Sequence, residues 1–398
     1  MSVNLADPKS FHDAVPHAAF ERLRREKPVH WTPTSSGTPH GGFWSLTRFA
    51  DIANTTRDPA TFTSRRGISY PVLPARTEGM ADNLMYNDPP DHTRLRRLVG
   101  AAFTPRMVAR FGDWITERVD AIIADLRGRG ECDLVPLIAV ELPAQVICSV
   151  MGVPENMRAQ VVAWANDLFS REIPDGGVER AMKARAAVMN YALELRDRNW
   201  DTRGDNMISE LAVAQRDGAS FTDSEYVQMV MTLVIAGFET THTLIGQSLR
   251  LILENPDIES QARAAVAAGN TRELVEEFLR YVTPAMHMGR HATRDVVLHD
   301  TTIKEGDTVL LWFVSANRDD SVFENPHTFD ASRPRNRHQS FGAGGPHFCL
   351  GNHLARLEVQ ILFERLFTDG LKITLNGQPQ RGWTIFINQL RALPAICQ

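Results

Sequence analysis

Cys349 stands in a glycine-rich stretch, residues 341–351, that runs directly into a predicted helix over residues 350–367. The first amides of a helix lack intrahelical partners and carry partial positive charge, so they favour the thiolate form of a nearby cysteine. A thiolate in such a loop is either a metal ligand or a nucleophile. The glycines leave little side-chain bulk, which allows a large flat ligand to approach the backbone. A haem whose iron binds the sulfur fits this arrangement.

Two other interpretations of Cys349 stay open at this point. A free cysteine is often a small buried hydrophobe with a purely structural role. His347 and His353 lie close enough in sequence to suggest zinc, although no CxxC pair or fourth ligand accompanies them. The rest of the chain has to decide between a haem, a structural thiol and a zinc site.

A second group of residues suited to catalysis lies in the long apolar stretch 224–254, where Glu239 and Thr240 follow Ala236 and Gly237. Small residues make room beside a helix, and a threonine can bond back to a carbonyl and open the helix. Space for a diatomic molecule beside a proton donor is what oxygen activation needs. The alternative is close helix packing with Glu239 on a wet face. If Glu239 is buried, it must be partnered or border a water-filled site.

Glu277 and Arg280 stand three residues apart on a predicted helix, which makes their side chains neighbours on one face. Arg333 lies shortly before the cysteine loop. A carboxylate shared by both guanidiniums would hold that loop in place. Taken alone, a helical pair of this kind is more often a solvated surface ion pair.

Four further side chains could hold an anionic ligand. His92 and Arg96 are one helical turn apart, Arg290 precedes a predicted strand, and His347 stands two residues before Cys349. Charge-assisted hydrogen bonds from such groups would neutralise the two propionates of a haem. The alternative is surface charge with no common role.

The composition of the 398-residue chain is that of an ordinary soluble globular protein, with 43% apolar and 23% charged residues. A net charge of −5 provides no strongly basic surface, so nucleic acid is not an expected partner. The four cysteines lack a disulfide-framework spacing and the N-terminus lacks a signal-peptide pattern, which favours a cytoplasmic protein. No stretch approaches the roughly 18–20 uninterrupted apolar residues of a membrane span, so no membrane is expected as a partner.

Helical periodicity dominates from residue 91 onward. Helices are expected over residues 91–99, 106–127, 143–151, 157–169, 178–200, 224–254, 256–268, 272–281 and 350–367. Short strands are expected at residues 43–47, 296–298, 308–313 and within 371–396. The expected fold class is mainly α with small β-sheets. A single domain is expected over residues 1–398, β-rich near 30–70, 295–315 and 371–396, with a helical core over 91–281 and 350–367.

In their order and spacing, these motifs resemble the cytochrome P450 family over nearly the whole chain. The resemblance implies the cytochrome P450 fold, haem b as the cofactor, and Cys349 as the ligand of its iron. In the family, the residues that match Glu239 and Thr240 deliver protons during oxygen activation. Two further sets are implied, a structural triad of Glu277, Arg280 and Arg333, and a haem-binding set of His92, Arg96, Ala236, Arg290, Phe341, His347 and Gly351.

The cysteine loop departs from the family pattern in one respect. Phe341 stands eight residues before Cys349, whereas the usual spacing is seven, so the loop is one residue longer. His347 keeps its customary offset. Together with residues 284–288 and 386–388, the longer loop looks like that of a bacterial branch that hydroxylates steroids, terpenoids and methyl-branched lipids.

The resemblance implies a monooxygenase that inserts one oxygen atom from O2 into a C–H bond of an apolar small molecule. That substrate would be a terpenoid, steroid, fatty acid or secondary metabolite. Electrons would come from a separate ferredoxin with its reductase, for which the expected docking patch is Arg94, Arg97, Arg106 and Arg356. Residues 64–86 are expected to supply a lid. The expected substrate contacts, each also compatible with an ordinary core position, are Ile235, Ala236, Ala285, Met286, Phe386 and Ile387.

Other functions stay compatible with these motifs. A non-catalytic haem-binding sensor or carrier also needs Cys349 and the propionate partners, but it has no use for Glu239 beside Thr240. Within the family, the alternative is a non-hydroxylating oxidation, carbon–carbon bond formation or nitric oxide reduction. A peroxide-driven member typically lacks the acid and alcohol pair.

Overall fold

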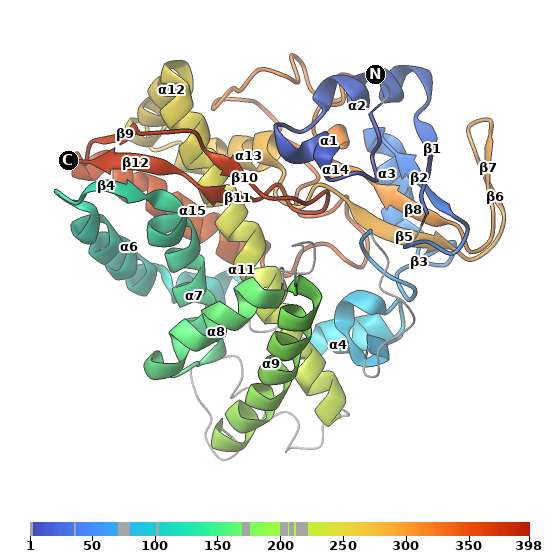
Figure 1. Cartoon of the computed structure of the whole chain (residues 1–398), viewed down its shortest axis with the longest axis horizontal. Coiled ribbons are helices and arrows are strands. Elements are labelled where there is room, and N and C mark those ends of the chain that lie inside the picture. Colours follow the sequence, from blue (N-terminus) through green and yellow to red (C-terminus); the bar gives the residue numbers. More distant parts are fainter. Residues whose placement is uncertain are drawn as a thin grey trace.

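A central helix, α11 (Asp223–Glu254), runs through the middle of the molecule in the computed structural model (Figure 1). The structure describes residues 3–35, 37–70, 80–100, 103–168, 176–199, 206, 211 and 222–398. Residues 71–79 of the expected lid, and residues 169 and 200 at the ends of two expected helices, lie outside the described residues.

The start of α11 is fixed by a capping box, in which the Thr222 side chain accepts from the Glu225 amide and the Glu225 side chain accepts from the Thr222 amide. By length and composition α11 could cross a membrane. However, 78% of its most apolar window is buried inside the protein. Burial of this extent identifies α11 as a core helix.

The other helices surround α11 or flank the sheets, and in Figure 1 α9 and the lower end of α11 reach the bottom of the view. Their bounds are α1 (Lys9–His12), α2 (His17–Glu26), α3 (Phe49–Arg57), α4 (Asp91–Gly100), α5 (Pro105–Ala109), α6 (Gly112–Leu126), α7 (Glu141–Met151), α8 (Glu155–Leu168), α9 (Gly177–Asn199), α12 (Pro256–Ala267), α13 (Thr271–Val282), α14 (Phe313–Ala316) and α15 (Asn352–Asp369). Shorter turns are η1 (Met80–Asp82), η2 (Leu84–Tyr86) and the π-helical η4 (Val135–Val140).

The strands form small sheets at the margins of the helical core (Figure 1). A five-stranded sheet has the order β1-β2-β8-β5-β3, in which β2 and β8 are parallel and the other pairs are antiparallel. A three-stranded sheet has the order β4-β12-β9, and β6–β7 and β10–β11 form two-stranded ribbons. The bounds are β1 (Val29–Pro33), β2 (Gly42–Leu46), β3 (Phe62–Thr63), β4 (Gly130–Asp133), β5 (Met288–Ala292), β6 (Val296–Leu298), β7 (Thr301–Ile303), β8 (Thr308–Leu311), β9 (Ile373–Leu375), β10 (Gln380–Arg381), β11 (Leu390–Ala392) and β12 (Pro394–Cys397).

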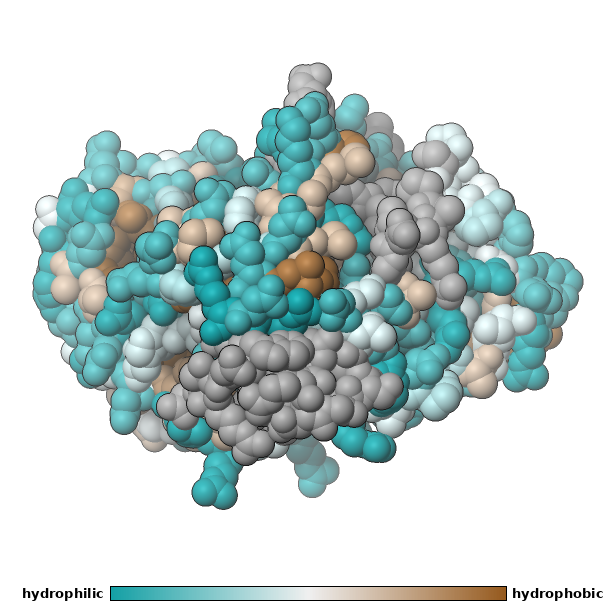
Figure 2. Space-filling model, turned by 90° about the horizontal axis from the view of Figure 1, so that it is seen from below, coloured by the Kyte–Doolittle hydropathy of each residue, from teal (hydrophilic) through white to brown (hydrophobic). Residues whose placement is uncertain are grey.

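The largest apolar cluster lies in the helical part and combines side chains of α6, α7, α11, α13 and α15. Two smaller clusters cover the five-stranded sheet. The surface seen from below is mostly hydrophilic, with small separate hydrophobic patches (Figure 2). The fold class expected from the sequence, mainly α with small β-sheets, is therefore confirmed.

Several expected element boundaries are wrong, most of them by one or two residues. The expected helix 106–127 is two helices, because the amides of Arg110 and Phe111 bond to carbonyls three residues back and end α5. The expected strand 308–313 ends at Leu311, and α14 follows directly. The helix expected from residue 350 begins at Asn352. The last difference lengthens the loop around the cysteine.

Candidate active site

A cavity lies between α11, the cysteine loop and α15. Its empty space is about 1560 Å³, including the part open to solvent. Most of the lining is apolar, as at Ile147, Met229 and Leu233, and ionisable side chains make up the smaller part. The cavity wall therefore combines a large apolar surface with a few charged and polar groups.

The Cys349 side chain lines this cavity. Its amide donates to the carbonyl of Phe341 at 2.9 Å, and its carbonyl accepts from the Asn352 side chain at 2.8 Å. The Arg356 guanidinium lies over the Phe341 ring, 4.4 Å from its centre. The longer loop is thus closed by a hydrogen bond between Phe341 and Cys349, and Phe341 is held by a residue of α15.

The electrostatics of Cys349 differ from the sequence-based expectation. Burial raises the pKa of the thiol, although a hydrogen bond from the backbone at Gly351 and the charges of Arg96 and Arg356 lower it. Loss of solvation disfavours the charged form more than these groups favour it. The expected push toward thiolate by the helix terminus is therefore outweighed, and the free side chain is a neutral thiol. A cation at the sulfur would reverse this balance.

Four basic side chains line another part of the wall. Loss of solvation, together with the Arg96 charge, lowers the pKa of His92 to about 4, and burial lowers that of Arg290 to about 10. The pKa of His347 is well below its usual value for the same reason. Within the described part of the chain, both ring nitrogens of His92 lack a hydrogen-bond partner. Too little negative charge surrounds these buried groups to balance their protonated forms. An anionic ligand would supply that charge.

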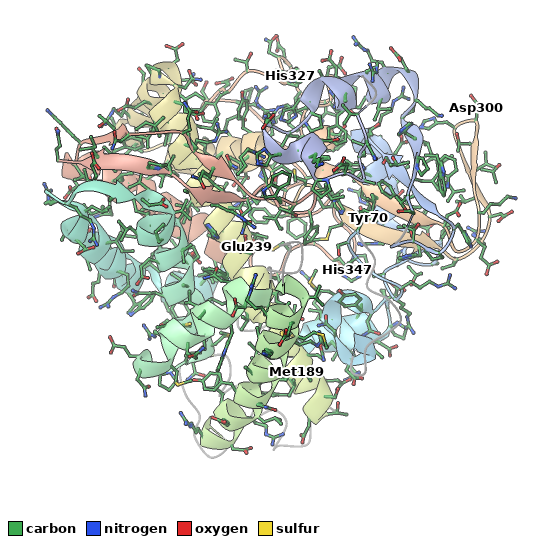
Figure 3. The ribbon with its side chains drawn as sticks, in the orientation of Figure 1. Tyr70, Met189, Glu239, Asp300, His327 and His347 are labelled. Carbon is green, nitrogen blue, oxygen red and sulfur yellow. The ribbon has the colours of Figure 1, made fainter. Side chains whose placement is uncertain are left out.

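Thr240 and Glu239 are neighbours in α11 but differ in what they face. Thr240 lines the cavity, and its hydroxyl donates to the carbonyl of Ala236 at 2.9 Å, the backward bond expected from the sequence. Glu239 is 1% exposed and does not belong to the cavity lining. Its Oε1 accepts from Gln389 Nε2 at 2.8 Å. Figure 3 shows Glu239 on α11 and His347 on the cysteine loop. The buried glutamate is partnered, as burial requires.

Glu277 joins two arginines in the interior. Its carboxylate accepts from Arg280 at 2.7 and 2.8 Å and from Arg333 at 3.1 Å. The amide of Asp330 and the side chain of Asn336 also donate to it, at 2.8 and 2.9 Å. Glu277 and Arg280 are fully buried. The network therefore ties α13 to the irregular segment that leads to the cysteine loop.

A comparison with protein families identifies the chain. The model described as Cytochrome P450 matches residues 45–369. The chain belongs to the cytochrome P450 family. It is accordingly a P450 monooxygenase, an oxidoreductase whose cofactor is a haem held through a thiolate.

Relatives and solved structures agree with this assignment. The chain is 33% identical over 390 residues to a methyl-branched lipid omega-hydroxylase of Mycobacterium tuberculosis, covering 96% of this chain and 91% of that protein. It is 32% identical over 395 residues to a steroid C26-monooxygenase of the same species, covering 96% and 90%. The structure of Mycobacterium marinum cytochrome P450 CYP268A2 in complex with pseudoionone has a TM-score of 0.87 and 33% identity, covering 95% of this chain and 94% of that one. This P450 therefore has the cytochrome P450 fold.

The cavity fits the haem that the family implies. The lining contains Cys349 together with the four basic residues, and both ring nitrogens of His92 lack a partner among the described residues. Ala236 on α11 and Phe341 and Gly351 in the loop, the other members of the implied haem-binding set, also belong to the lining. No group of three or more His, Cys, Asp or Glu side chains among the described residues could hold a metal ion. A closed zinc site at Cys349 is therefore not supported.

The expected substrate contacts divide into two groups. Ala236 and Ala285 belong to the cavity lining. Ile235 packs against the main core cluster, and Met286 is fully buried in the cluster beside the five-stranded sheet. Phe386 and Ile387 also lie outside the lining, although Ile387 forms a β-bridge with Ala285. The segment that contains Ile387 thus contacts the backbone of a lining residue without lining the cavity itself.

Several lining residues were missed from the sequence. Met229 and Leu233 share the helical spacing of Ala236 and Thr240, so that spacing could have found them. Met85 was not singled out either, although it lies in η2, within the segment 64–86 that was expected to supply a lid. Glu358 on α15 also lines the cavity, and burial raises its pKa well above the usual value. Loss of solvation therefore favours the neutral form of this carboxyl.

Half of the expected docking patch is already engaged. Arg94 pairs with Glu225 at the start of α11, and Arg356 pairs with Glu276. Arg97 and Arg106 are exposed. Two of the four arginines, Arg97 and Arg106, are therefore left to contact a partner protein.

Proposed function

We propose that this P450 inserts one oxygen atom from O2 into a C–H bond of an apolar lipid, steroid or terpenoid, with haem b as cofactor. Electrons come from a separate ferredoxin and its reductase. One observation carries the proposal: Cys349 and Thr240, which come from different elements, line the same largely apolar cavity. Catalysis of this kind needs a metal ligand, a hydroxyl beside the reacting oxygen, and a surface that excludes water.

In this proposal Cys349 would ligate the iron, and His92, Arg96, Arg290 and His347 would bind the propionates. The bound haem supplies the iron at which O2 is reduced. The Thr240 hydroxyl, held by its bond to a backbone carbonyl, positions a proton beside that oxygen. Glu239, which directly precedes Thr240 in the chain, carries the proton toward Thr240 after its hydrogen bond to Gln389 opens. Proton delivery of this kind typically contributes about 10²–10⁴-fold to a rate.

The proposed substrate class follows from the lining and from similar proteins. Met85, Met229 and Met288 line the cavity, and flexible thioether side chains adapt to apolar molecules of different shape. Two relatives act, by name, on a methyl-branched lipid and a steroid. A similar structure, from Bacillus megaterium and 27% identical, is a complex with testosterone. An apolar chain or ring system is the chemistry common to these ligands.

The remaining parts of the proposal concern the partner and the setting. Arg97 and Arg106 are exposed, and Phe348, beside Cys349, is 36% exposed, which supports docking of an acidic ferredoxin on this side. Free thiols at Cys132 and Cys397, 3.4 Å apart, support a reducing cytoplasm. A cavity lined from residue 56 to residue 358 supports a single domain.

Replacing Thr240 with alanine tests the proposed chemistry. We expect product per O2 consumed to fall about tenfold or more, with peroxide rising to match, because a proton is no longer positioned. The spectrum of the reduced, carbon monoxide-treated protein should stay unchanged. Ser248→Ala is the matched control, because this buried hydroxyl lies on the same helix outside the cavity lining. Equal coupling in both variants would refute the role of Thr240, and a sensor or carrier would give no product in any variant.

A further inference from the structure

A polar stripe runs along α11 beside the face that lines the cavity. It consists of Glu239, His242, Thr243, Gln247 and Arg250, whose spacing of three or four residues places them on one side of the helix. The first four are at most 3% exposed. The Arg250 side chain is 24% exposed. The stripe therefore leads from the interior, next to Thr240, to the surface.

The outer half of the stripe is a connected set of hydrogen bonds. Arg250 Nε donates to Gln247 Oε1 at 2.8 Å, and Gln247 Nε2 donates to the carbonyl of Asn388 at 2.8 Å. At the inner end Gln389, the next residue in the chain, donates to Glu239. The segment that precedes β11 thus follows α11 from the surface to the buried carboxylate. Polar groups on two elements face each other over this length.

Several polar atoms of the inner half lack hydrogen-bond partners among the residues that the structure describes. Glu239 Oε2, both ring nitrogens of His242 and the hydroxyl of Thr243 form no hydrogen bond with any residue that the structure describes. Glu239 Oε2 and His242 Nδ1 are 3.7 Å apart, too far for a direct bond. Buried polar atoms are almost always satisfied, by protein or by ordered water. Several such atoms on adjacent turns of one helix indicate bridging water at this place.

We propose that this stripe is a proton-entry path, in which ordered water joined to Thr243 and His242 carries protons from the surface near Arg250 to Glu239. The inference rests on the proposed role of Glu239 beside Thr240. Each turnover takes one O2, two electrons from the redox partner and two protons, and releases water with the hydroxylated product. A carboxylate that gives up a proton must regain one from solvent.

The position of Glu239 explains why a separate path is needed. An apolar substrate that fills the cavity excludes water from it, so protons cannot reach Thr240 through the substrate side. Glu239 stands outside the cavity lining, whereas its neighbour Thr240 belongs to it. A carboxylate at this boundary can take a proton on one side and give it up on the other. His242 acts as a positioning residue, because its ring holds the water that lies between it and the carboxylate.

Thr243→Val is the sharpest test, because it removes the unpartnered hydroxyl without changing the shape of the side chain. His242→Phe is the second variant and keeps a ring beside Phe238, whose centre lies 5.7 Å away. Ser248→Ala is the matched control: its hydroxyl is also buried and unpartnered among the described residues, but lies off the stripe. The holoenzyme is assayed with a surrogate ferredoxin and its reductase, with pseudoionone as the probe substrate.

Both path variants should lower product per O2 by about tenfold, less than a direct proton donor contributes, and should raise the solvent deuterium isotope effect. Ser248→Ala should behave as wild type. The spin-state shift on pseudoionone binding and the carbon monoxide spectrum should be unchanged in all three. A second readout needs no turnover: a crystal structure of the wild-type holoenzyme should contain ordered water within hydrogen-bond distance of Glu239 Oε2 and His242.

The results separate the path from the proposed function. If Thr240→Ala uncouples the reaction but both path variants match Ser248→Ala, the path is refuted and the function stands. If Thr240→Ala has no effect, the proposed function itself fails. A dry space between Glu239 and His242 in the crystal would refute the path independently of any activity.

Discussion

Gly345 offers the most direct test of how the cysteine loop is held. Its φ of +79° lies in the left-handed region that only glycine adopts easily. A Cβ at this position would lie 2.3 Å from the carbonyl oxygen of Thr56 and 3.3 Å from the Cα of Arg57. These are backbone atoms of α3, so no side-chain rotation can relieve the contact. Gly345→Ala must therefore move the loop away from α3.

Gly342 separates backbone strain from this contact. Its φ is +90°, yet the nearest atom to an added Cβ would be 3.8 Å away, an ordinary van der Waals distance. Gly342→Ala should cost only the left-handed strain, about 1–2 kcal/mol. Gly345→Ala adds the cost of overpacking, about 1–3 kcal/mol. The difference between the two variants measures how firmly the loop rests on α3.

Denaturant unfolding of the two holoproteins gives this difference, and haem content per chain gives its consequence for the site. We expect Gly345→Ala to be less stable than Gly342→Ala by about 1–3 kcal/mol and to retain less haem. If the two variants lose equal stability, the contact with α3 does not hold the loop. The close approach of Gly345 to Thr56 would then make no measurable contribution to the free energy of unfolding.

Two further predictions concern buried charge. Glu277→Gln leaves Arg280 and Arg333 without their counter-charge and should lower the free energy of unfolding by about 3–5 kcal/mol. Arg263→Gln is the comparison variant, because it breaks the exposed ion pair with Glu259 and should lower the free energy of unfolding by less than about 1 kcal/mol. If urea unfolding shows similar losses for the two variants, this prediction is wrong. Burial lowers the pKa of His287 from 6.5 to about 3, so the unfolded state binds this proton first on acidification. The free energy of unfolding should therefore fall as the pH is lowered from 6.5 toward 3, and His287→Gln should make this pH dependence weaker. If the pH dependence of stability is the same in the variant and the wild type, the prediction is wrong.

The helical core could be predicted from the sequence because its periodicity is strong. The expected helix 224–254 differs from α11 by one residue at its start, since the capping box and the long apolar pattern are local signals. The expected strand 308–313 failed at its end because Trp312 turns the chain into α14, and its amide bonds to Leu46 of β2. That contact joins residues far apart in sequence. Local propensity contains no information about it.

In the candidate site, too, features set by local sequence could be predicted, and features set by long-range contacts could not. Thr240 and its backward bond follow from helix geometry alone. The orientation of Glu239 could not be predicted, because its partner Gln389 lies 150 residues away. Met286 and Phe386 were expected in the cavity on sequence grounds, yet they pack beside the sheet around His287. Which of two adjacent apolar residues faces a cavity depends on tertiary packing, and the sequence pattern of a short irregular segment does not determine it.

The charge state of Cys349 explains why the cavity suits one ligand rather than two. Burial keeps the thiol neutral, so the sulfur becomes a thiolate only when a cation compensates it. Elsewhere on the same wall, His92 and Arg290 have pKa values lowered by lost solvation, so their charged forms need an anion. A molecule that carries both a metal cation and carboxylates satisfies the two demands together. Separate ions would leave the apolar space between them unfilled, and a flat macrocycle would fill it.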